Sequence, residues 1–250
     1  KNDFMKGALL GPEYSNDYIK IFLKDNGFSY TKLNDDELPE KIADLIAQKK
    51  VIGWFQGRME FGPRALGSRT IIGDARSSRT QKTINLKIKY RESFRPFAPS
   101  IREEDISDYF EIDRPSPYML LVANVKKDKQ LQMTEEEESY FGLKKLNIPR
   151  SVIPAVTHVD YSARIQTVHK ETNPKYYDLL KEFKKITNCP VLVNTSFNVR
   201  GEPIVCSIKD AYRCFMGTNL DILICENFIL YKEKQNEQNK TDHKKDFQLD

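Results

Sequence analysis

The sequence lacks the features that would assign it at once to a membrane, disulfide-rich or metal-binding class. No apolar run approaches the roughly 20 residues that cross a bilayer, so we expect no membrane association. The three histidines are scattered and the four cysteines contain no CxxC pair, so the spacing does not favour a metal site. The cysteines lie in or beside apolar runs, which predicts buried free thiols and a cytoplasmic protein.

A strong charge of one sign is also missing. The 250 residues carry a net charge of +4, with 30% charged and 39% apolar side chains. Nucleic-acid-binding domains usually show a clustered basic face and an isoelectric point above about 9, so the totals do not favour a nucleic-acid partner. The length suffices for a sizeable core. Since the chain starts with neither an initiator Met nor a signal-like segment, we expect it to begin inside a longer protein.

Helix and strand patterns alternate along the chain, which indicates an α/β or α+β fold. Apolar spacing and capping signals predict helices at 15–27, 35–46, 80–89, 107–110, 174–188 and 207–215. Short apolar runs predict strands at 28–33, 51–55, 118–125, 191–193, 222–225 and 228–231.

One main domain is predicted, over residues 15–231. Residues 1–14 would be the end of a preceding domain or a linker. Residues 126–145 are heavily charged and read as an insertion, and the Lys, Gln, Asn and Asp-rich stretch 232–250 predicts a disordered polar tail.

What the sequence does contain is an arginine-rich and glycine-rich run after the predicted strand at 51–55. The run is Gly57-Arg58-Met59-Glu60-Phe61-Gly62-Pro63-Arg64-Ala65-Leu66-Gly67-Ser68-Arg69. Most arginines in turns are solvated surface charges. Here Gly62 and Pro63 fix the backbone before Arg64, and a preorganised guanidinium loses less entropy when it binds phosphate or carboxylate oxygens. Arg64 is therefore a candidate anion ligand, with Glu60 as its ion-pair partner or orienting group.

A second basic motif places Lys89, Arg91 and Arg95 beside the apolar segment Phe94-Arg95-Pro96-Phe97-Ala98-Pro99. The plainer alternative is a charged helix face followed by a loop. Cations beside an apolar wall are costly unless an anion neutralises them, and basic residues interleaved with aromatic ones can also contact RNA. The motif leaves phosphate binding and RNA binding both open.

A third group consists of short polar side chains around a predicted strand. Asn194, Ser196 and Asn198 follow the strand at 191–193, where α/β sheets commonly bind ligands. His158 lies upstream, near Arg164, although a lone histidine is more often structural than catalytic. No Ser-His-Asp or Cys-His arrangement follows from the spacing.

Together these runs resemble the C-terminal half of the O-carbamoyltransferases, a family that includes enzymes of nodulation-factor and antibiotic biosynthesis. The resemblance rests on the motifs Gly57 to Gly67, Phe94 to Pro99, Pro154 to Gln166 and Asn194 to Asn198. It implies a YrdC-like fold, in which a twisted mixed sheet flanked by helices encloses a basic cavity.

The resemblance also implies a reaction. The cavity would form carbamoyl-adenylate from carbamoyl phosphate and ATP with Mg²⁺, for transfer to a hydroxyl acceptor. In this family a threonylcarbamoyl-transferase-like N-terminal domain of the same polypeptide carries a His-ligated metal and the acceptor site. This chain looks like the C-terminal domain alone, so the acceptor stays open.

Site residues follow from the same resemblance. YrdC-like proteins carry Lys-X-Arg and Ser-X-Asn signatures, which match Lys89-Tyr90-Arg91 and Ser196-Phe197-Asn198. Tyr161-Ser162 departs from the usual Gly-Thr before the arginine of the third motif. The resemblance implies catalytic roles for Lys89, Arg95 and Arg64, and substrate or nucleotide binding by Arg91, His158, Arg164, Asn194, Ser196 and Asn198.

Two functions of other classes remain as alternatives. One is an RNA-binding module that uses the basic concave face of a YrdC-like fold, which salt-dependent RNA binding in competition with ATP would support. The other is a non-catalytic regulatory domain that binds nucleotide. The motif match favours the enzyme. The lack of an evident nucleophile is expected for it, because adenylate formation needs cations and in-line positioning rather than a covalent nucleophile.

Overall fold

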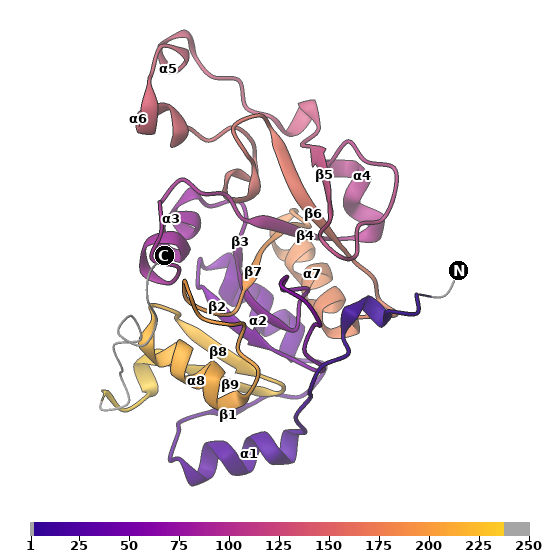
Figure 1. Cartoon of the computed structure of the whole chain (residues 1–250), viewed down its shortest axis with the longest axis vertical. Coiled ribbons are helices and arrows are strands. Elements are labelled where there is room, and N and C mark those ends of the chain that lie inside the picture. The colour runs from indigo at the N-terminus through magenta and orange to yellow at the C-terminus, as the bar shows by residue number, and fades with distance from the viewer. Residues whose placement is uncertain (1–2, 238–250) are drawn as a thin grey trace.

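The computed structural model describes residues 3–237, and these form a mixed sheet flanked by helices (Figure 1). The described strands lie in the order β1-β9-β8-β2-β3-β7-β4-β6-β5. Only the neighbours β2 and β8, and β4 and β6, run parallel. The predicted α/β class is confirmed. The strands span Thr31–Lys32 (β1), Ile52–Phe55 (β2), Arg69–Asp74 (β3), Ala98–Arg102 (β4), Leu121–Asn124 (β5), Ser162–Val168 (β6), Leu192–Ser196 (β7), Ile222–Cys225 (β8) and Phe228–Tyr231 (β9).

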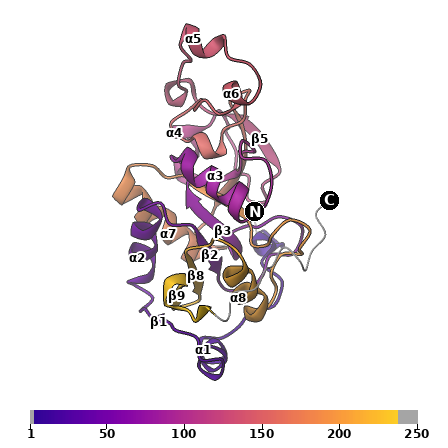
Figure 2. The ribbon, with the colours of Figure 1, turned by 90° about the vertical axis from the view of Figure 1, so that its left-hand side faces the viewer.

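Helices cover both faces of the sheet. Figure 2 shows α2 and α7 on one side of it and α8 on the other. In the part of the chain that is described, no helix has the length and hydropathy to span a bilayer. The helices span Asn16–Asp25 (α1), Leu38–Ala47 (α2), Ser78–Lys87 (α3), Ile106–Tyr109 (α4), Glu135–Glu138 (α5), Gly142–Leu146 (α6), Pro174–Thr187 (α7) and Ile208–Gly217 (α8).

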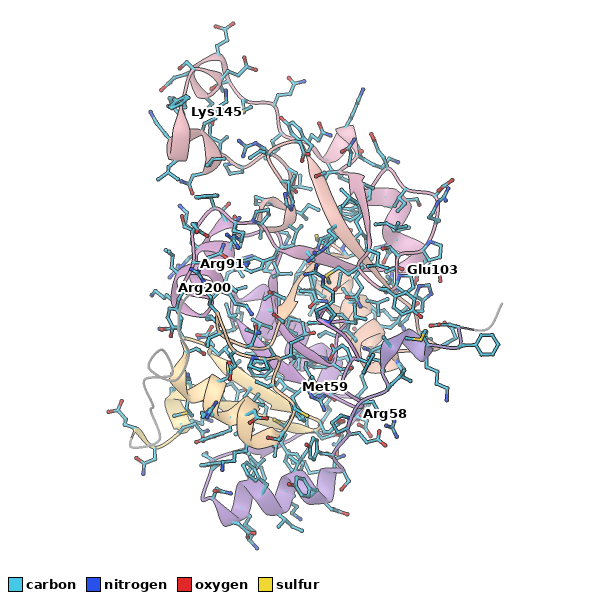
Figure 3. The ribbon with its side chains drawn as sticks, in the orientation of Figure 1. Arg58, Met59, Arg91, Glu103, Lys145 and Arg200 are labelled. Atoms are coloured by element: carbon cyan, nitrogen blue, oxygen red, sulfur yellow. The ribbon has the colours of Figure 1, made fainter. Side chains whose placement is uncertain are left out.

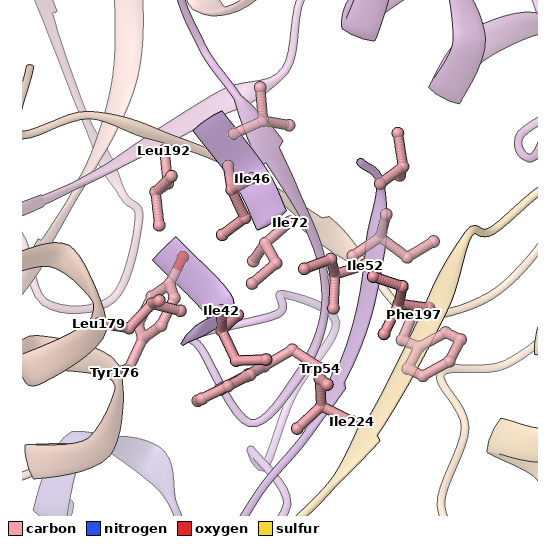
Figure 4. Close-up of a cluster of buried hydrophobic side chains, with 14 of the residues drawn as sticks. Ile42, Ile46, Ile52, Trp54, Ile72, Tyr176, Leu179, Leu192, Phe197 and Ile224 are labelled. Atoms are coloured by element: carbon pink, nitrogen blue, oxygen red, sulfur yellow. The ribbon is translucent and has the colours of Figure 1, made fainter. Parts of the chain in front are cut away.

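The core lies between the central strands and the helices α2 and α7, which pack against each other (Figure 4). Ile42 and Ile46, one helical turn apart on α2, are fully buried. On β2, Trp54 contacts Tyr176 of α7, with 6.4 Å between ring centroids. Burial of these large apolar side chains is the main stabilising contribution to the domain.

Local sequence signals predicted the helix ends well. Ser15 caps α1 by accepting a hydrogen bond from the Tyr18 amide at 3.2 Å. Ser207 and Asp210 form the expected capping box of α8. Helix α7 begins at Pro174, and Asn188 ends it in the left-handed conformation. These predictions are confirmed because each depends on neighbours in the chain.

Other predictions need correction. Strand 28–33 shrinks to β1 and strand 118–125 to β5, and α2 begins at Leu38 with no side-chain cap from Asp35 or Asp36. Strands β3, β4 and β6 were missed. They carry residues that are unusual in buried strands, such as Arg69 in β3 and Pro99 in β4.

The segments outside the predicted domain are more ordered than expected. The entry segment pairs with the Gly-rich run, since the Gly11 amide donates to Met59 O and the Met59 amide donates to Pro12 O, at 2.8 and 2.9 Å. At the other end, Lys232–Lys234 forms a short 3-10 helix and Gln235 is buried, so residues 232–237 are not a disordered tail. The remainder of that predicted tail, 238–250, lies outside the described residues.

The charged stretch 126–145 forms a projection from the sheet that contains α5 and α6 (Figures 1 and 2). An antiparallel bridge between Gln130 and Ser151 closes its base.

The cysteines are all free thiols, and three of them are buried. Cys206 is exposed, so the prediction of burial fails there. It lies in the irregular segment that precedes α8.

Strand β2 lies so close to the turn after β7 that only glycine fits at position 53. A Cβ at Gly53 would lie 2.5 Å from the ring of Phe197, which is fully buried. Phe197 is the middle residue of the Ser-X-Asn signature. Packing on Gly53 therefore anchors that turn to the sheet.

We predict that Gly53→Ala lowers the free energy of unfolding by about 1 to 3 kcal/mol, because the added methyl group overpacks this contact. Urea unfolding followed by tryptophan fluorescence measures the change. The double variant Gly53→Ala/Phe197→Leu should lose less free energy of unfolding than the sum of the losses in the two single variants, since the smaller side chain relieves the clash. A Gly53→Ala protein as stable as the original would contradict this packing.

Candidate functional site

A cavity of about 460 Å³ lies where β4, β6 and β7 meet the Gly-rich loop. Among its described lining residues there is no Asp or Glu. Lys89 and Asn198 are not among the lining residues and lie behind Ser196. The predicted site residues that line the cavity are Arg64, Arg91, Arg95, His158, Arg164, Asn194 and Ser196.

The register of the strands brings these residues together. Arg164 lies on β6 and shares a face of that strand with Gln166, and Asn194 shares a face of β7 with Ser196, because side chains alternate along a strand. Strand β4 lies between them, with Ala98 opposite Asn194 and Ser100 opposite Gln166. Asn194 and Ser196 therefore belong to a strand, where the sequence had placed them after one.

Two arginines face the cavity without an acidic partner. The pKa of Arg164 is lowered by burial and by the neighbouring Arg64 guanidinium. Within residues 3–237, no carboxylate forms an ion pair with either side chain, and the buried Nε of Arg164 has no hydrogen-bond partner. Uncompensated cations at close range favour the binding of an anion.

Arg91 and Arg95 complete the basic wall. Arg91 Nε donates to Asn85 Oδ1 at 2.7 Å, and its guanidinium lies 4.9 Å from the centre of the Phe97 ring. Burial, with a smaller contribution from Arg95, lowers the pKa of Arg91 to about 10. Arg95 is more exposed and pairs with Glu92 at 3.1 Å. Figure 3 shows Arg91 on the opposite side of the molecule from Glu103, which lines the larger cavity described below.

His158 stands at the rim of this wall. Partial burial lowers the pKa of its imidazole and the Arg164 charge adds to the effect, while Asp160 opposes it. A neutral ring leaves a nitrogen free to accept a hydrogen bond, so His158 adds little positive charge to the site near neutral pH.

Glu60 holds the Gly-rich loop in place, which agrees with the predicted role of an orienting group. Its buried carboxylate accepts hydrogen bonds from the amides of Leu66, Ser68 and Arg69, at 2.7 to 3.0 Å. A carboxylate that receives several backbone N–H groups is held strongly in place. The loop is thereby closed on itself next to Arg64.

The carbonyl groups of the same loop are held from the sheet. Asn194 Nδ2 donates to Ala65 O at 2.9 Å, and Gln166 Nε2 donates to Leu66 O at 2.8 Å. Ser100 Oγ donates to Gln166 Oε1 at 2.6 Å. Ser100 and Gln166 were not predicted as site residues. The polar alternation Arg164, Gln166 within 162–168 was the signal that would have identified this strand and its face.

Arg69, at the end of the same run, belongs to the core. It is fully buried with its guanidinium 3.6 Å from the centre of the Phe55 ring. It donates to Gln56 O at 2.9 Å and to Pro12 O at 3.2 Å. Within this run, Arg64 therefore lines the cavity and Arg69 is buried in the core.

Lys89 supports the cavity from behind. Its buried ammonium donates to Asn198 O at 2.9 Å and to Ser196 Oγ at 3.2 Å, and it also contacts Ser196 O and Asn198 Oδ1. The Lys-X-Arg and Ser-X-Asn signatures thus meet in space. Burial, with a smaller contribution from the Arg91 charge, lowers the pKa of Lys89 to about 7, although the Glu202 carboxylate opposes the shift.

A larger cavity, of about 1120 Å³, lies elsewhere and contains none of the predicted site residues. Its lining includes the acidic residues Asp3, Glu103, Glu171 and Glu226. Glu226 forms an ion pair with Lys175, and Glu103 contacts His169 at 2.8 Å. It offers an anion much less unbalanced positive charge than the smaller cavity does. We therefore take the smaller, basic cavity as the candidate site.

Comparison with known proteins gives a consistent picture. A family model described as carbamoyltransferase C-terminus matches residues 43–232. The chain is 58% identical over its whole length to an uncharacterized protein of Synechocystis, covering 41% of that protein. It is 44% identical over 79% of its length to nodulation protein NolO of Bradyrhizobium diazoefficiens, covering 33% of it.

Two further matches complete the comparison. The chain is 36% identical over 69% of its length to the 3'-hydroxymethylcephem-O-carbamoyltransferase of Streptomyces clavuligerus, covering 29% of it. The chain thus spans about two fifths or less of these curated relatives. Among solved structures, full-length HypF in its phosphate- and nucleotide-bound form matches 75% of this chain and 21% of its own, with a TM-score of 0.47 and 18% identity.

The buried ammonium of Lys89 gives a test that does not depend on any relative. Because its folded-state pKa of about 7 lies below the ordinary value of 10.5, the unfolded chain binds more protons between these values. The free energy of unfolding should therefore rise by about 1 to 2 kcal/mol between pH 6.5 and 8.5 through this group. Lys89→Met should remove that rise in urea titrations, and Lys20→Met, at an exposed position of α1, should keep it. Equal pH slopes in all three proteins would contradict the placement of Lys89.

Proposed function

Because this chain belongs to the carbamoyltransferase C-terminal family, we propose that it activates a carbamoyl group. It binds carbamoyl phosphate and MgATP in the basic cavity and forms carbamoyl-adenylate. The observation that carries the proposal is the set of four arginines around a 460 Å³ cavity that has no acidic residue among its described lining residues. A carboxylate-free site suits polyanions, and Mg²⁺ enters it on the triphosphate of the substrate.

The proposed reaction has two steps. Water attacks the phosphorus of carbamoyl phosphate, the bond from phosphorus to the carbamoyl oxygen breaks, and inorganic phosphate and carbamate form. A carbamate oxygen then attacks the α-phosphorus of ATP, and the bond to the β-phosphate oxygen breaks to release pyrophosphate. The sum is carbamoyl phosphate, ATP and water giving carbamoyl-adenylate, phosphate and pyrophosphate. Both displacements depend on positioning and charge stabilisation.

Each basic residue has a role that its surroundings support. Arg64 and Arg164, which lack acidic partners, bind phosphate oxygens and stabilise the charge that grows on them. Arg91 and Arg95 act from the adjoining wall, and Ser196 lines the cavity beside them with its hydroxyl proton donated to Asn198 Oδ1 at 2.7 Å. Lys89 holds the Ser196–Asn198 turn and takes up a proton when an anion binds, because a bound anion raises the pKa of a nearby lysine.

Transfer to the acceptor belongs to another part of the polypeptide. The relatives are two to three times longer than this chain, which leaves room for a threonylcarbamoyl-transferase-like domain that binds a hydroxyl acceptor. In that domain the acceptor oxygen attacks the carbamoyl carbon, AMP leaves, and the hydroxyl proton is lost. For this chain, use of ATP as a substrate and the four free thiols fit a protein of the reducing cytoplasm.

Loss of one unpaired arginine should weaken the reaction strongly. We expect Arg64→Ala and Arg164→Ala each to lower carbamoyl-phosphate-dependent pyrophosphate release by roughly 10- to 100-fold, since each removes charge-assisted hydrogen bonds. Arg114→Ala is the matched control, because Arg114 is exposed outside the cavity and pairs with Asp113. Calorimetry with MgATP and carbamoyl phosphate measures binding separately. Normal release by both cavity variants, or no binding of either ligand to folded protein, would refute the proposal.

A further inference from the structure

Besides the donor Arg164 Nε, one buried acceptor beside the basic cavity has no hydrogen-bond partner. Asn194 lines the cavity and is 1% exposed, and its Nδ2 donates to Ala65 O and to Gln166 Oε1. Its Oδ1 is buried and accepts no hydrogen bond in the structure. Buried acceptors are nearly always paired, so an unpaired one next to a ligand cavity calls for a specific donor.

The orientation of this amide is fixed by its neighbours. Ala65 O is a backbone carbonyl and can only accept, so the Asn194 atom that faces it is the nitrogen. Leu66 O fixes Gln166 in the same way, which leaves Gln166 Oε1 to receive both Ser100 Oγ and Asn194 Nδ2. A flip of either amide would place oxygen against oxygen. The unpaired atom of Asn194 is therefore an oxygen and not a nitrogen.

The other polar groups of the wall recognise a different chemistry. The four arginines can only donate hydrogen bonds, and they suit phosphate oxygens. The site thus combines donors for a phosphate with a buried, carbonyl-type acceptor. A small ligand that satisfies both must carry a phosphate and, within a few bonds of it, a hydrogen-bond donor such as an N–H group.

We propose that Asn194 Oδ1 accepts a hydrogen bond from the amino group of carbamoyl phosphate and that Asn194 is a residue that selects this substrate over acyl phosphates. The inference rests on the proposed function and assigns the recognition of the carbamoyl nitrogen within it. Acetyl phosphate has nearly the same shape but carries a methyl group in place of the amino group. It would leave the buried oxygen unpaired against a carbon atom.

The test uses two stable phosphonates that differ only in that group: phosphonoacetamide, which carries the amino group, and 2-oxopropylphosphonate, which carries the methyl group. Calorimetry on the full chain should show phosphonoacetamide binding roughly 10-fold more tightly or better, because only the amide gives the buried oxygen a partner. Equal affinities in the unmodified protein would overturn the inference while leaving the proposed function intact. Failure of both phosphonates to bind would refute the proposed function itself.

Variants separate recognition from support of the loop. Asn194→Leu should remove the preference for the amide, whereas Ser100→Ala, which loosens Gln166 without touching the unpaired oxygen, should weaken both ligands by a similar factor and keep the preference. Urea unfolding of each variant establishes that it is folded. If folded Asn194→Leu protein keeps the original preference, or if Ser100→Ala abolishes it, Asn194 does not select the substrate. The comparison of the two ligands on unmodified protein stands even if Asn194→Leu fails to fold.

Discussion

The structure depends on the way in which the backbone of residues 65–69 is held from two sides. The Glu60 carboxylate takes the amides, and the side-chain amides of Asn194 and Gln166 take the carbonyls. Because buried backbone groups must be paired, a loop with all these bonds made has one favoured conformation. Arg64 directly precedes this segment, so the fixed backbone also fixes the position from which its side chain reaches the cavity.

Such support allows the cavity to keep positive charge that the fold does not neutralise. Arg64 and Arg164 repel each other, and burial lowers the pKa values of Arg164, Arg91 and Lys89. Each of these features destabilises the free protein and favours a bound anion, and perturbed groups of this kind cluster at functional sites. The larger cavity, where Lys175 and Glu226 already pair, shows the ordinary arrangement.

The sequence predicted those parts of the molecule that depend on near neighbours. The ends of α1, α7 and α8 follow from Ser15, Pro174 and Ser207, and seven of the nine predicted site residues line the cavity. Strands β3, β4 and β6 were missed because tertiary pairing overrides the unfavourable local signals of Arg69, Pro99 and Arg164. The roles of Gln166 and Ser100, and the position of Lys89 behind Ser196, depend on contacts between residues 66 to 107 positions apart along the chain, which local patterns do not encode.

A crystal structure of the chain with phosphonoacetamide and a non-hydrolysable ATP analogue bound tests the central claim most directly. The account predicts that the phosphonate oxygens contact Arg64 and Arg164, that the amide nitrogen lies within hydrogen-bond distance of Asn194 Oδ1, and that residues 65–69 keep their bonds to Glu60, Gln166 and Asn194. Ligand bound in the larger cavity beside Glu103 and Lys175, or a Gly-rich loop that releases these bonds when ligand enters, would contradict it.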